Sequence, residues 1–277
     1  MSKRHRFTAL VSMRATVLAL AATVALLTMA VACDTPAEHD SDPEQESPPE
    51  QESTREPQTD AEKLATRIVE THGGTHWESI QTMAFTFVVA DGEERRFEAH
   101  HEWDVQAGTD RVKWRDDEDR LWDVLVDIET ASAQQAHIDD EPLEGAELDD
   151  AGEQGYTRWI NDTYWLLMPI KLFDPGVTLR LEEGLREDES PEDAKPGLAT
   201  LELTFEDVGL TPGDRYRVRV DMETYEIDSW QMDLEGRDEL IDVDWGGYEQ
   251  LGDLYLPLER TWRDRDQRLF FEDVAVD

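Results

Sequence analysis

Apolar and polar side chains alternate with a period of two along most of the chain from residue 83 onward. In residues 216–222, for example, the even positions are apolar and the odd positions are charged. Successive side chains of a strand point to opposite faces, so this pattern predicts strands with one buried and one wet face. Turn sequences such as Asp91-Gly92 and Glu235-Gly236 separate the segments. The predicted strands cover residues 83–89, 97–103, 110–114, 120–128, 177–181, 198–205, 215–222, 226–234, 240–245, 255–262 and 268–276.

The short connections between these strands favour an antiparallel meander. A sheet of roughly eleven strands curls, because so long a twisted sheet does not stay open and flat. We therefore predict a mainly β fold of the α+β class. It is a curved antiparallel meander, or incomplete β-barrel, with an N-terminal helix and a short helix packed on its concave face.

The N-terminal helix is predicted from its start signal, its apolar face and its end. Thr59 and Glu62 form the pattern of a capping box, and residues 64–69 supply apolar side chains at helical spacing. His72 followed by Gly73 marks the end of a helix of about 13 residues. A protonated His72 would suit the negative end of the helix dipole.

The second helix is predicted within residues 156–173, the most apolar stretch after the first 33 residues. Pro169 stops a helix near Met168, so residues 157–168 are predicted to be helical and to lie against the concave face. The acidic segments 139–155 and 186–197 show no periodicity and are predicted to be loops.

The first residues of the chain have the pattern of an export signal. A basic start is followed by an uncharged run over residues 15–32, and then by Cys33, the only cysteine. An acidic, proline-bearing segment follows, and it is too polar to bury a core. We expect a signal peptide at 1–32, a disordered linker at 33–59 and one folded domain at 60–277. An uncleaved anchor and simple secretion remain alternatives, and each places the folded domain outside the cytoplasm.

The residues Met29-Ala30-Val31-Ala32-Cys33 resemble the lipobox of bacterial lipoproteins. The resemblance implies that the peptide bond before Cys33 is cleaved and that the cysteine is acylated, for instance with palmitate. Ala30 departs from the commoner leucine at that position. The implied location is the cell envelope, with a lipid anchor holding the protein on the periplasmic or extracellular face of a membrane. We expect the protein to be a monomer.

The chain is strongly acidic, with 66 acidic and 26 basic side chains and a formal net charge of −40. Such a charge repels nucleic acid and anionic lipid surfaces, so a nucleic-acid partner is not expected. Abundant acid with little lysine is a pattern of salt-adapted proteins. We therefore expect a halophilic character, with lower stability at low ionic strength, where self-repulsion is not screened.

The motifs of common enzyme and metal sites are absent from the sequence. It contains no Gly-x-Ser-x-Gly, no phosphate-binding glycine loop and no His-Glu-x-x-His. His72 and His76 are separated by two glycines that break a helix, and His100 and His101 point to opposite faces of a strand. We predict no catalytic residue, no metal site and no cofactor, and do not expect an enzyme.

Nine tryptophans are the unusual feature of the composition. Tryptophans on strands usually fill a core, but several here could instead line an apolar cavity that takes an acyl chain. The residues predicted to line such a cavity are Trp103, Trp114, Trp159, Tyr164, Trp165, Leu166 and Met168.

Several motifs together resemble an uncharacterised family of bacterial exported proteins. They are His72-Gly73-Gly74 with Trp77, Phe85-x-Phe87, Trp103-Asp104, the run from Trp159-Ile160-Asn161-Asp162 to Tyr164-Trp165-Leu166-Leu167 and Pro169, and Thr211-Pro212-Gly213-Asp214. At the level of fold, the chain is similar to the periplasmic lipoprotein-carrier proteins of the LolA and LolB type. That resemblance implies a half-barrel whose helices cover an apolar cavity.

Three functions stay open on the sequence alone. The first is an envelope-anchored, non-enzymatic lipoprotein that binds or carries a lipid, an acyl chain or another apolar ligand. The second is a structural or protein-interaction lipoprotein with a fully packed core. The third, which we favour least, is an envelope hydrolase.

Overall fold

The computed structural model describes residues 59–182, 197–205, 213–237 and 239–277. Their strands form one 13-stranded sheet in the order β6-β5-β4-β3-β2-β1-β13-β12-β11-β10-β9-β8-β7. Two meanders, one from each half of the chain, therefore meet where β1 pairs with β13. All the strand pairs are antiparallel. The strands are β1 (Thr82–Asp91), β2 (Glu94–Asp104), β3 (Thr109–Arg115), β4 (Leu121–Asp127), β5 (Ser132–Ile138), β6 (Glu141–Pro142), β7 (Val177–Glu182), β8 (Leu198–Phe205), β9 (Arg215–Asp221), β10 (Ile227–Asp233), β11 (Ile241–Leu251), β12 (Leu254–Trp262) and β13 (Gln267–Val276).

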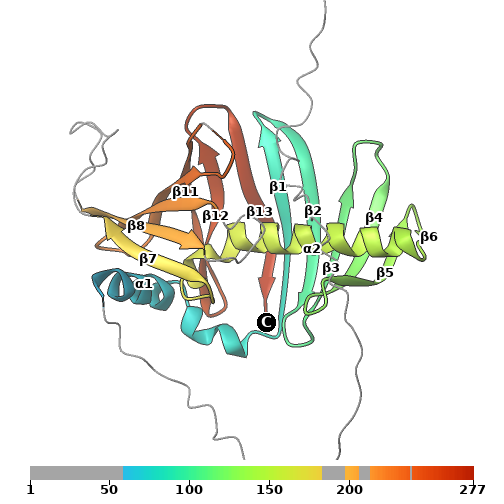
Figure 1. Ribbon diagram of the computed structural model, residues 1–277, viewed down its shortest axis with the longest axis horizontal. Coiled ribbons are helices and arrows are strands. Elements are labelled where there is room, and N and C mark those ends of the chain that lie inside the picture. The colour runs from blue at the N-terminus through green and yellow to red at the C-terminus, as the bar shows by residue number, and fades with distance from the viewer. Residues whose placement is uncertain (1–58, 183–196, 206–212, 238) are drawn as a thin grey trace, which may run out of the picture. The chain divides into compact units, whose positions relative to one another are not determined.

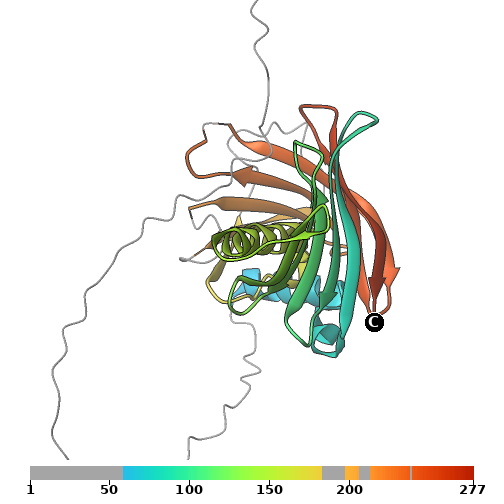
Figure 2. The same ribbon diagram turned by 90° about the vertical axis from the view of Figure 1, so that its right-hand side faces the viewer.

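The predicted fold class is confirmed. The sheet curls around a long helix, α2 (Ala146–Leu167), which crosses its concave side (Figures 1 and 2). All eleven predicted strands are present, and β5 and β6 are additional. Met222, expected to continue the buried face of β9, instead lies in the turn after it and is 45% exposed.

Helix α1 (Asp60–Thr71) has the predicted capping box. The Glu62 backbone N–H donates to the Thr59 hydroxyl at 3.1 Å, and the Thr59 N–H donates to the Glu62 carboxylate at 2.8 Å. The face of α1 that carries Leu64 and Ile68 is buried in the core. A 3₁₀ helix, η1 (Gly74–Ser79), then leads to β1.

His72 differs from the expectation of a protonated side chain at the helix end. It is fully buried, and its Nδ1 lies 2.7 Å from the carbonyl oxygen of Ile68. Burial lowers its pKa, and the hydrogen bond to Ile68 and the charge of Glu226 only partly oppose this. The interior therefore favours a neutral His72.

Helix α2 is longer than predicted, because residues 146–155 are helical rather than part of a loop. This half of the helix is acidic on its outside and buries Ala151, Gly152 and Gly155. A Cβ on Gly152 would lie 2.4 Å from the backbone nitrogen of Ala133, so glycine permits close contact between α2 and β5. Small buried residues carry little hydrophobic signal, which explains why the sequence pattern missed this half. A 3₁₀ turn, η2 (Met168–Ile170), follows α2 and contains Pro169.

The core lies between α2 and the concave face of the sheet and consists of three clusters. The first joins α1 and the end of α2 to β8–β11, the second joins the C-terminal half of α2 to β1, β2, β12 and β13, and the third joins the start of α2 to β2–β5. A single helix thus covers most of the width of the sheet.

The predicted signal peptide, Cys33 and the linker up to residue 58 lie outside the described residues, as do most of the predicted 186–197 loop and Thr211-Pro212. Within the part of the chain that the structure describes, no helix is both long and apolar enough to cross a membrane.

Candidate functional site

Strands β12 and β13 separate within the sheet. They pair only over Glu259–Thr261 and Arg268–Phe270, next to the turn that joins them. Farther from this turn, β12 still pairs with β11 and β13 still pairs with β1. There β12 and β13 no longer pair with each other. The sheet is therefore open between Leu254–Leu258 on one side and Phe271–Val276 on the other.

A bulge bends β13 where it leaves β12. Ala84 of β1 faces Ala275, whereas Thr86 faces Glu272, so β13 holds one extra residue between these pairs. Asp273 takes a φ of 52°, in the left-handed region. Bulges bend and twist a strand, and this one turns β13 away from β12.

The exposed edge of β12 has few free hydrogen-bonding groups. The Tyr255 N–H donates to the carbonyl oxygen of His72 at 3.3 Å, and Pro257 has no N–H. The carbonyl oxygen of Pro257 accepts a hydrogen bond from the Arg260 guanidinium at 2.9 Å. The opening thus offers side chains rather than an edge ready to pair with another strand.

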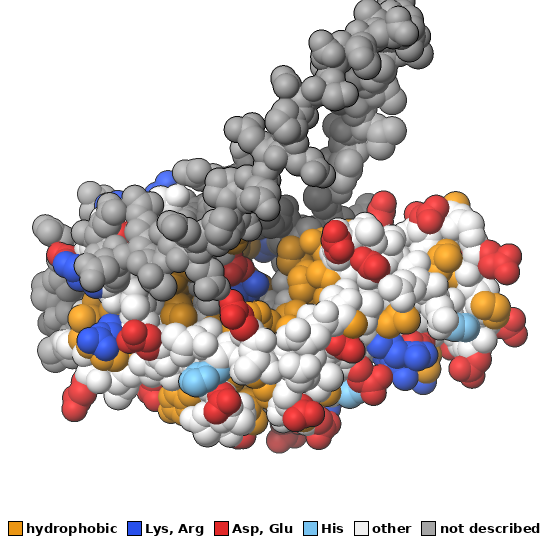
Figure 3. Space-filling view, turned by 90° about the horizontal axis from the view of Figure 1, so that it is seen from below, with side chains coloured by type: hydrophobic (Ala, Val, Ile, Leu, Met, Phe, Trp, Pro, Cys, Tyr) orange, Lys and Arg blue, Asp and Glu red, His pale blue; other side chains and the backbone are white. Residues whose placement is uncertain are grey.

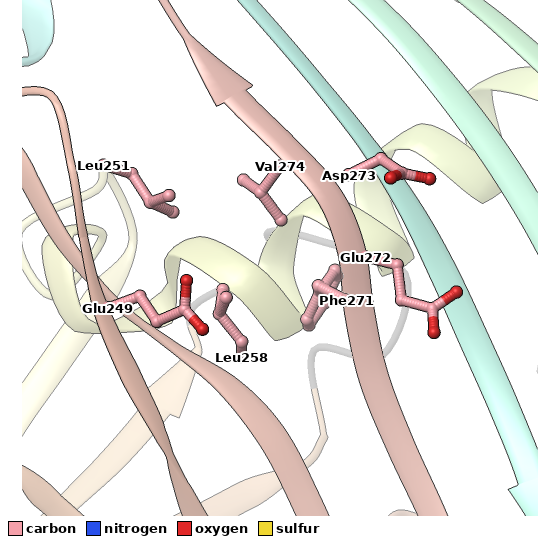
Figure 4. Close-up of a pocket in the computed structure, with 7 residues that line it drawn as sticks. All are labelled: Glu249, Leu251, Leu258, Phe271, Glu272, Asp273 and Val274. Atoms are coloured by element: carbon pink, nitrogen blue, oxygen red, sulfur yellow. The ribbon is translucent and has the colours of Figure 1, made fainter.

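A hollow of about 490 Å³ lies at this opening. Leu251, Leu258, Phe271 and Val274 line it and converge on one space in front of α2 (Figure 4). All four also contact the second core cluster. The hollow therefore borders the apolar interior.

Three acidic residues complete the lining: Glu249, Glu272 and Asp273. The carboxylates of Glu272 and Asp273 point away from the hollow in Figure 4. Arg95 holds Glu272 through two contacts of 2.8 Å. Acidic side chains also surround the hydrophobic groups on the face of the molecule seen in Figure 3. The carboxylate of Glu249 is directed toward the hollow (Figure 4), so the hollow combines four apolar side chains with negative charge.

None of the seven residues predicted to line a cavity lines this hollow. Trp103, Trp114, Leu166 and Met168 are at most 8% exposed, and Trp159, Tyr164 and Trp165 are half-buried. Trp103 and Leu166 belong to the core cluster beneath the hollow, Met168 to the first cluster and Trp114 to the third. The structure brings Trp103 and Trp159 together, with ring centroids 5.5 Å apart, but leaves Trp114 in another cluster.

A buried ionic group joins α2 to the sheet. His101 of β2 has its Nδ1 2.7 Å from Asp110 and its Nε2 3.1 Å from Asp162 of α2, and all three side chains are fully buried. Burial alone would lower the pKa of His101, but the two carboxylates outweigh it and raise the pKa to about 9. The two carboxyl groups thus favour the protonated form of the imidazole that lies between them.

This group serves structure rather than catalysis, because a substrate in solution cannot reach side chains with no exposed surface. Asn161 adds a hydrogen bond to Asp162 at 2.7 Å, and the ring of Phe85 stacks on His101 at 4.6 Å. Sequence reasoning missed the group. Two signals pointed to it: Asn161-Asp162 interrupts the most apolar stretch, and His101 has the same parity as the inward-facing Ala99 and Trp103.

Arg260 is a second charge in the interior, with no exposed surface. Its guanidinium donates to the carbonyl oxygens of Pro257, Glu259 and Trp165, and it lies 3.7 Å from the ring centroid of Trp245. Burial lowers its pKa to about 9. In the described residues no carboxylate lies within ion-pair distance of it.

Metal ligation finds no support among the described residues, where no group of three or more His, Cys, Asp or Glu side chains is placed to hold an ion.

No protein-family model matches the sequence. No curated protein matches it either. Among solved structures, a DUF1329 family protein from Desulfovibrio piger is 11% identical, with a TM-score of 0.40, over 78% of this chain and 91% of that one. A LolA superfamily protein from Nitrosomonas europaea is 9% identical, with a TM-score of 0.42, over 76% of this chain and 92% of that one. The chain is thus similar in structure, at low identity, to DUF1329 and LolA-superfamily proteins.

Proposed function

We propose that this protein is an envelope-anchored, non-enzymatic lipoprotein that binds an acyl chain or another apolar ligand through the opening between β12 and β13. The observation that supports this most is the hollow at the opening, where four apolar side chains converge next to the core.

The chemistry of the opening favours an apolar ligand over a peptide strand. A strand would need free N–H and C=O groups along β12, and His72, Pro257 and Arg260 leave few of them. An alkyl chain needs only apolar contact, and each buried CH₂ group contributes about 0.8 kcal/mol. The hollow of about 490 Å³ lies within the size range of small-molecule sites, roughly 300–1,000 Å³.

The anchoring part of the proposal rests on the sequence around Cys33. An acylated Cys33 would hold the folded domain near a membrane, where apolar ligands are abundant. Mass spectrometry of the full chain from bacterial membranes should show a lipid on an N-terminal Cys33, whereas Cys33→Ala should be released to the soluble fraction. An unacylated protein that keeps its first residues would contradict this part.

The binding part is tested with an uncharged apolar probe, N-phenyl-1-naphthylamine, titrated into the full chain. Val274→Trp places a large ring in the hollow and should weaken probe binding at least tenfold. Met222→Trp adds the same ring at an exposed turn and serves as the control, so its binding should match that of the unmodified protein. Equal binding of the probe by both variants, or no binding by the unmodified protein, would contradict the proposal.

The competing proposal is a structural or interaction lipoprotein with a packed core. The burial of Trp103, Trp114, Leu166 and Met168 favours it, since these side chains fill space rather than line it. Under this alternative, native mass spectrometry of protein taken from membranes shows no co-purifying small ligand, and a partner protein is recovered in stoichiometric amount.

A further inference from the structure

Three buried hydrogen-bond donors lie together in the interior and have no acceptor among the described residues. They are the Nε1 of Trp230, the Nε1 of Trp245 and the Nε of Arg260. Each belongs to a residue with at most 7% of its surface exposed. Buried polar groups in proteins are nearly always paired, so three neighbouring unpaired donors need an explanation.

The three donors form one connected group. The rings of Trp230 and Trp245 are 5.4 Å apart, and the Arg260 guanidinium carbon lies 3.7 Å from the Trp245 ring centroid. Trp165 of α2 closes the group, because its ring lies 4.8 Å from Trp230 and its carbonyl oxygen accepts a hydrogen bond from Arg260. The group thus spans β10, β11, β12 and α2.

The group also carries a positive charge that the described part of the chain does not balance. Arginines elsewhere on the sheet, such as Arg95, Arg111 and Arg268, form ion pairs with carboxylates. Among the described residues, the Arg260 guanidinium has its hydrogen bonds to carbonyl oxygens and its ring contacts to aromatic faces, although the protein has 66 acidic side chains. A buried cation is normally paired with an anion. This site therefore has a positive charge without a nearby carboxylate and N–H donors without acceptors in the described residues.

The group lies next to the hollow between β12 and β13. The Arg260 guanidinium carbon is 5.8 Å from the ring centroid of Phe271, which lines the hollow. Leu258, also in the lining, lies two residues before Arg260 and so on the same face of β12. Phe271 therefore lies next to both the hollow and the guanidinium.

We propose that Trp230, Trp245 and Arg260 receive the carboxylate of a fatty acid whose alkyl chain occupies the hollow, an inference that rests on the proposed apolar binding there. A carboxylate offers two oxygens to several N–H donors, and its single negative charge matches the single guanidinium. The head group would lie inside and the chain would extend toward the opening.

The test compares two ligands with the same chain length, dodecanoate and 1-dodecanol, by calorimetric titration of the full chain. Dodecanoate should bind at least tenfold more tightly, because only it supplies the anion. Trp230→Phe and Trp245→Phe keep an aromatic ring and remove one N–H each. Each should weaken dodecanoate binding about tenfold and leave dodecanol binding unchanged.

Trp114→Phe is the control. It makes the same replacement at a buried position of the third core cluster, which contains neither the residues that line the hollow nor the three donors. This variant should bind dodecanoate as the unmodified protein does. Added salt should strengthen dodecanoate binding, because it screens repulsion between the anion and a protein of net charge −40.

The outcomes separate the two proposals. Equal binding of the two ligands, unaffected by the tryptophan variants, keeps apolar binding and overturns the carboxylate site, leaving water as the partner of the donors. Tighter binding of dodecyl phosphate than of dodecanoate also overturns the carboxylate assignment and points to a phospholipid head group. Binding of none of these ligands overturns the proposed function together with this inference.

Discussion

The Nε2 atom of His101 lies 3.1 Å from the Oδ2 atom of Asp162, inside the protein and 61 positions away along the chain. This contact fixes helix α2 to strand β2 at the middle of the sheet. Because Asp110 holds the other ring nitrogen at 2.7 Å, the imidazole is oriented from both sides.

Stability should therefore fall as the pH rises from about 6.5 to about 9. The pKa of His101 is raised to about 9 in the folded protein, whereas the pKa of a histidine in an unfolded chain is about 6.5. The folded state binds the extra proton across this window, so its stabilisation is complete below about pH 6.5 and is lost as the pH passes about 9. The loss should reach at most about 3 kcal/mol.

Chemical denaturation at several pH values between 6.5 and 9 measures this effect. His101→Gln should remove the slope, whereas His100→Gln, on the outer face, should retain it. Burial lowers the pKa of both His72 and Arg260. His72 therefore changes the free energy of unfolding with pH only below about pH 6.5, and Arg260 only above about pH 9. A free energy of unfolding that stays constant from pH 6.5 to 9 would show that His101 is not charged in the folded protein.

Tyr248→Phe should destabilise the protein by about 1–3 kcal/mol. The Tyr248 hydroxyl accepts a hydrogen bond from the Ile227 N–H at 2.8 Å and donates one to the Ile227 carbonyl oxygen at 2.9 Å. Ile227 lies beyond the paired stretch of β10 and β11, so no ladder bond from β11 replaces these two.

The control for this prediction is Tyr255→Phe. Among the described residues, the Tyr255 hydroxyl has one hydrogen bond, to the part-buried carboxylate of Glu226 at 2.6 Å, so its loss should matter less. Urea unfolding of both variants gives the comparison. An equal decrease in the free energy of unfolding in the two variants would argue against a special role for the two hydrogen bonds between Tyr248 and the Ile227 backbone.

Gly152→Ala should lower the melting temperature, although alanine is the better helix former by about 1 kcal/mol. The added Cβ would lie 2.4 Å from the backbone nitrogen of Ala133 and 3.0 Å from the carbonyl carbon of Ser132, and backbone atoms cannot move aside easily. Overpacking of this kind costs about 1–3 kcal/mol. In a domain of this size, each kcal/mol corresponds to roughly 2–4 °C.

Differential scanning calorimetry of Gly152→Ala and of Gln154→Ala tests this. Gln154 is exposed on the same helix, so its replacement reports the helix propensity alone. A melting temperature that rises for Gly152→Ala would show that α2 and β5 are not in close contact.

Added salt should raise the melting temperature. The chain has a net charge of −40, and the repulsion among its carboxylates is strongest when counterions are few. Thermal unfolding in dilute buffer and in molar sodium chloride measures the difference, with molar sucrose as an uncharged control for general solute effects. Identical melting temperatures in dilute buffer and in salt would refute the expectation of a salt-adapted protein.

The sequence alone determined α1 and the eleven long strands, because their signals are local. The capping box at Thr59 and Glu62 acts within one turn of helix, and alternation in a segment such as 198–205 reflects neighbours two residues apart. A curved sheet follows from the number of such strands, since a long twisted sheet must curl.

Only the tertiary structure decided the rest. The first half of α2 and strand β5 bury glycine and alanine, whose contribution comes from close backbone contact rather than from apolar surface. The pairing of His101 with Asp162 and the grouping of Trp230, Trp245 and Arg260 join residues distant in sequence. The opening between β12 and β13 depends on a bulge at Asp273 whose effect is set by the neighbouring strands. Such features arise from packing between elements, which no local pattern of side chains encodes.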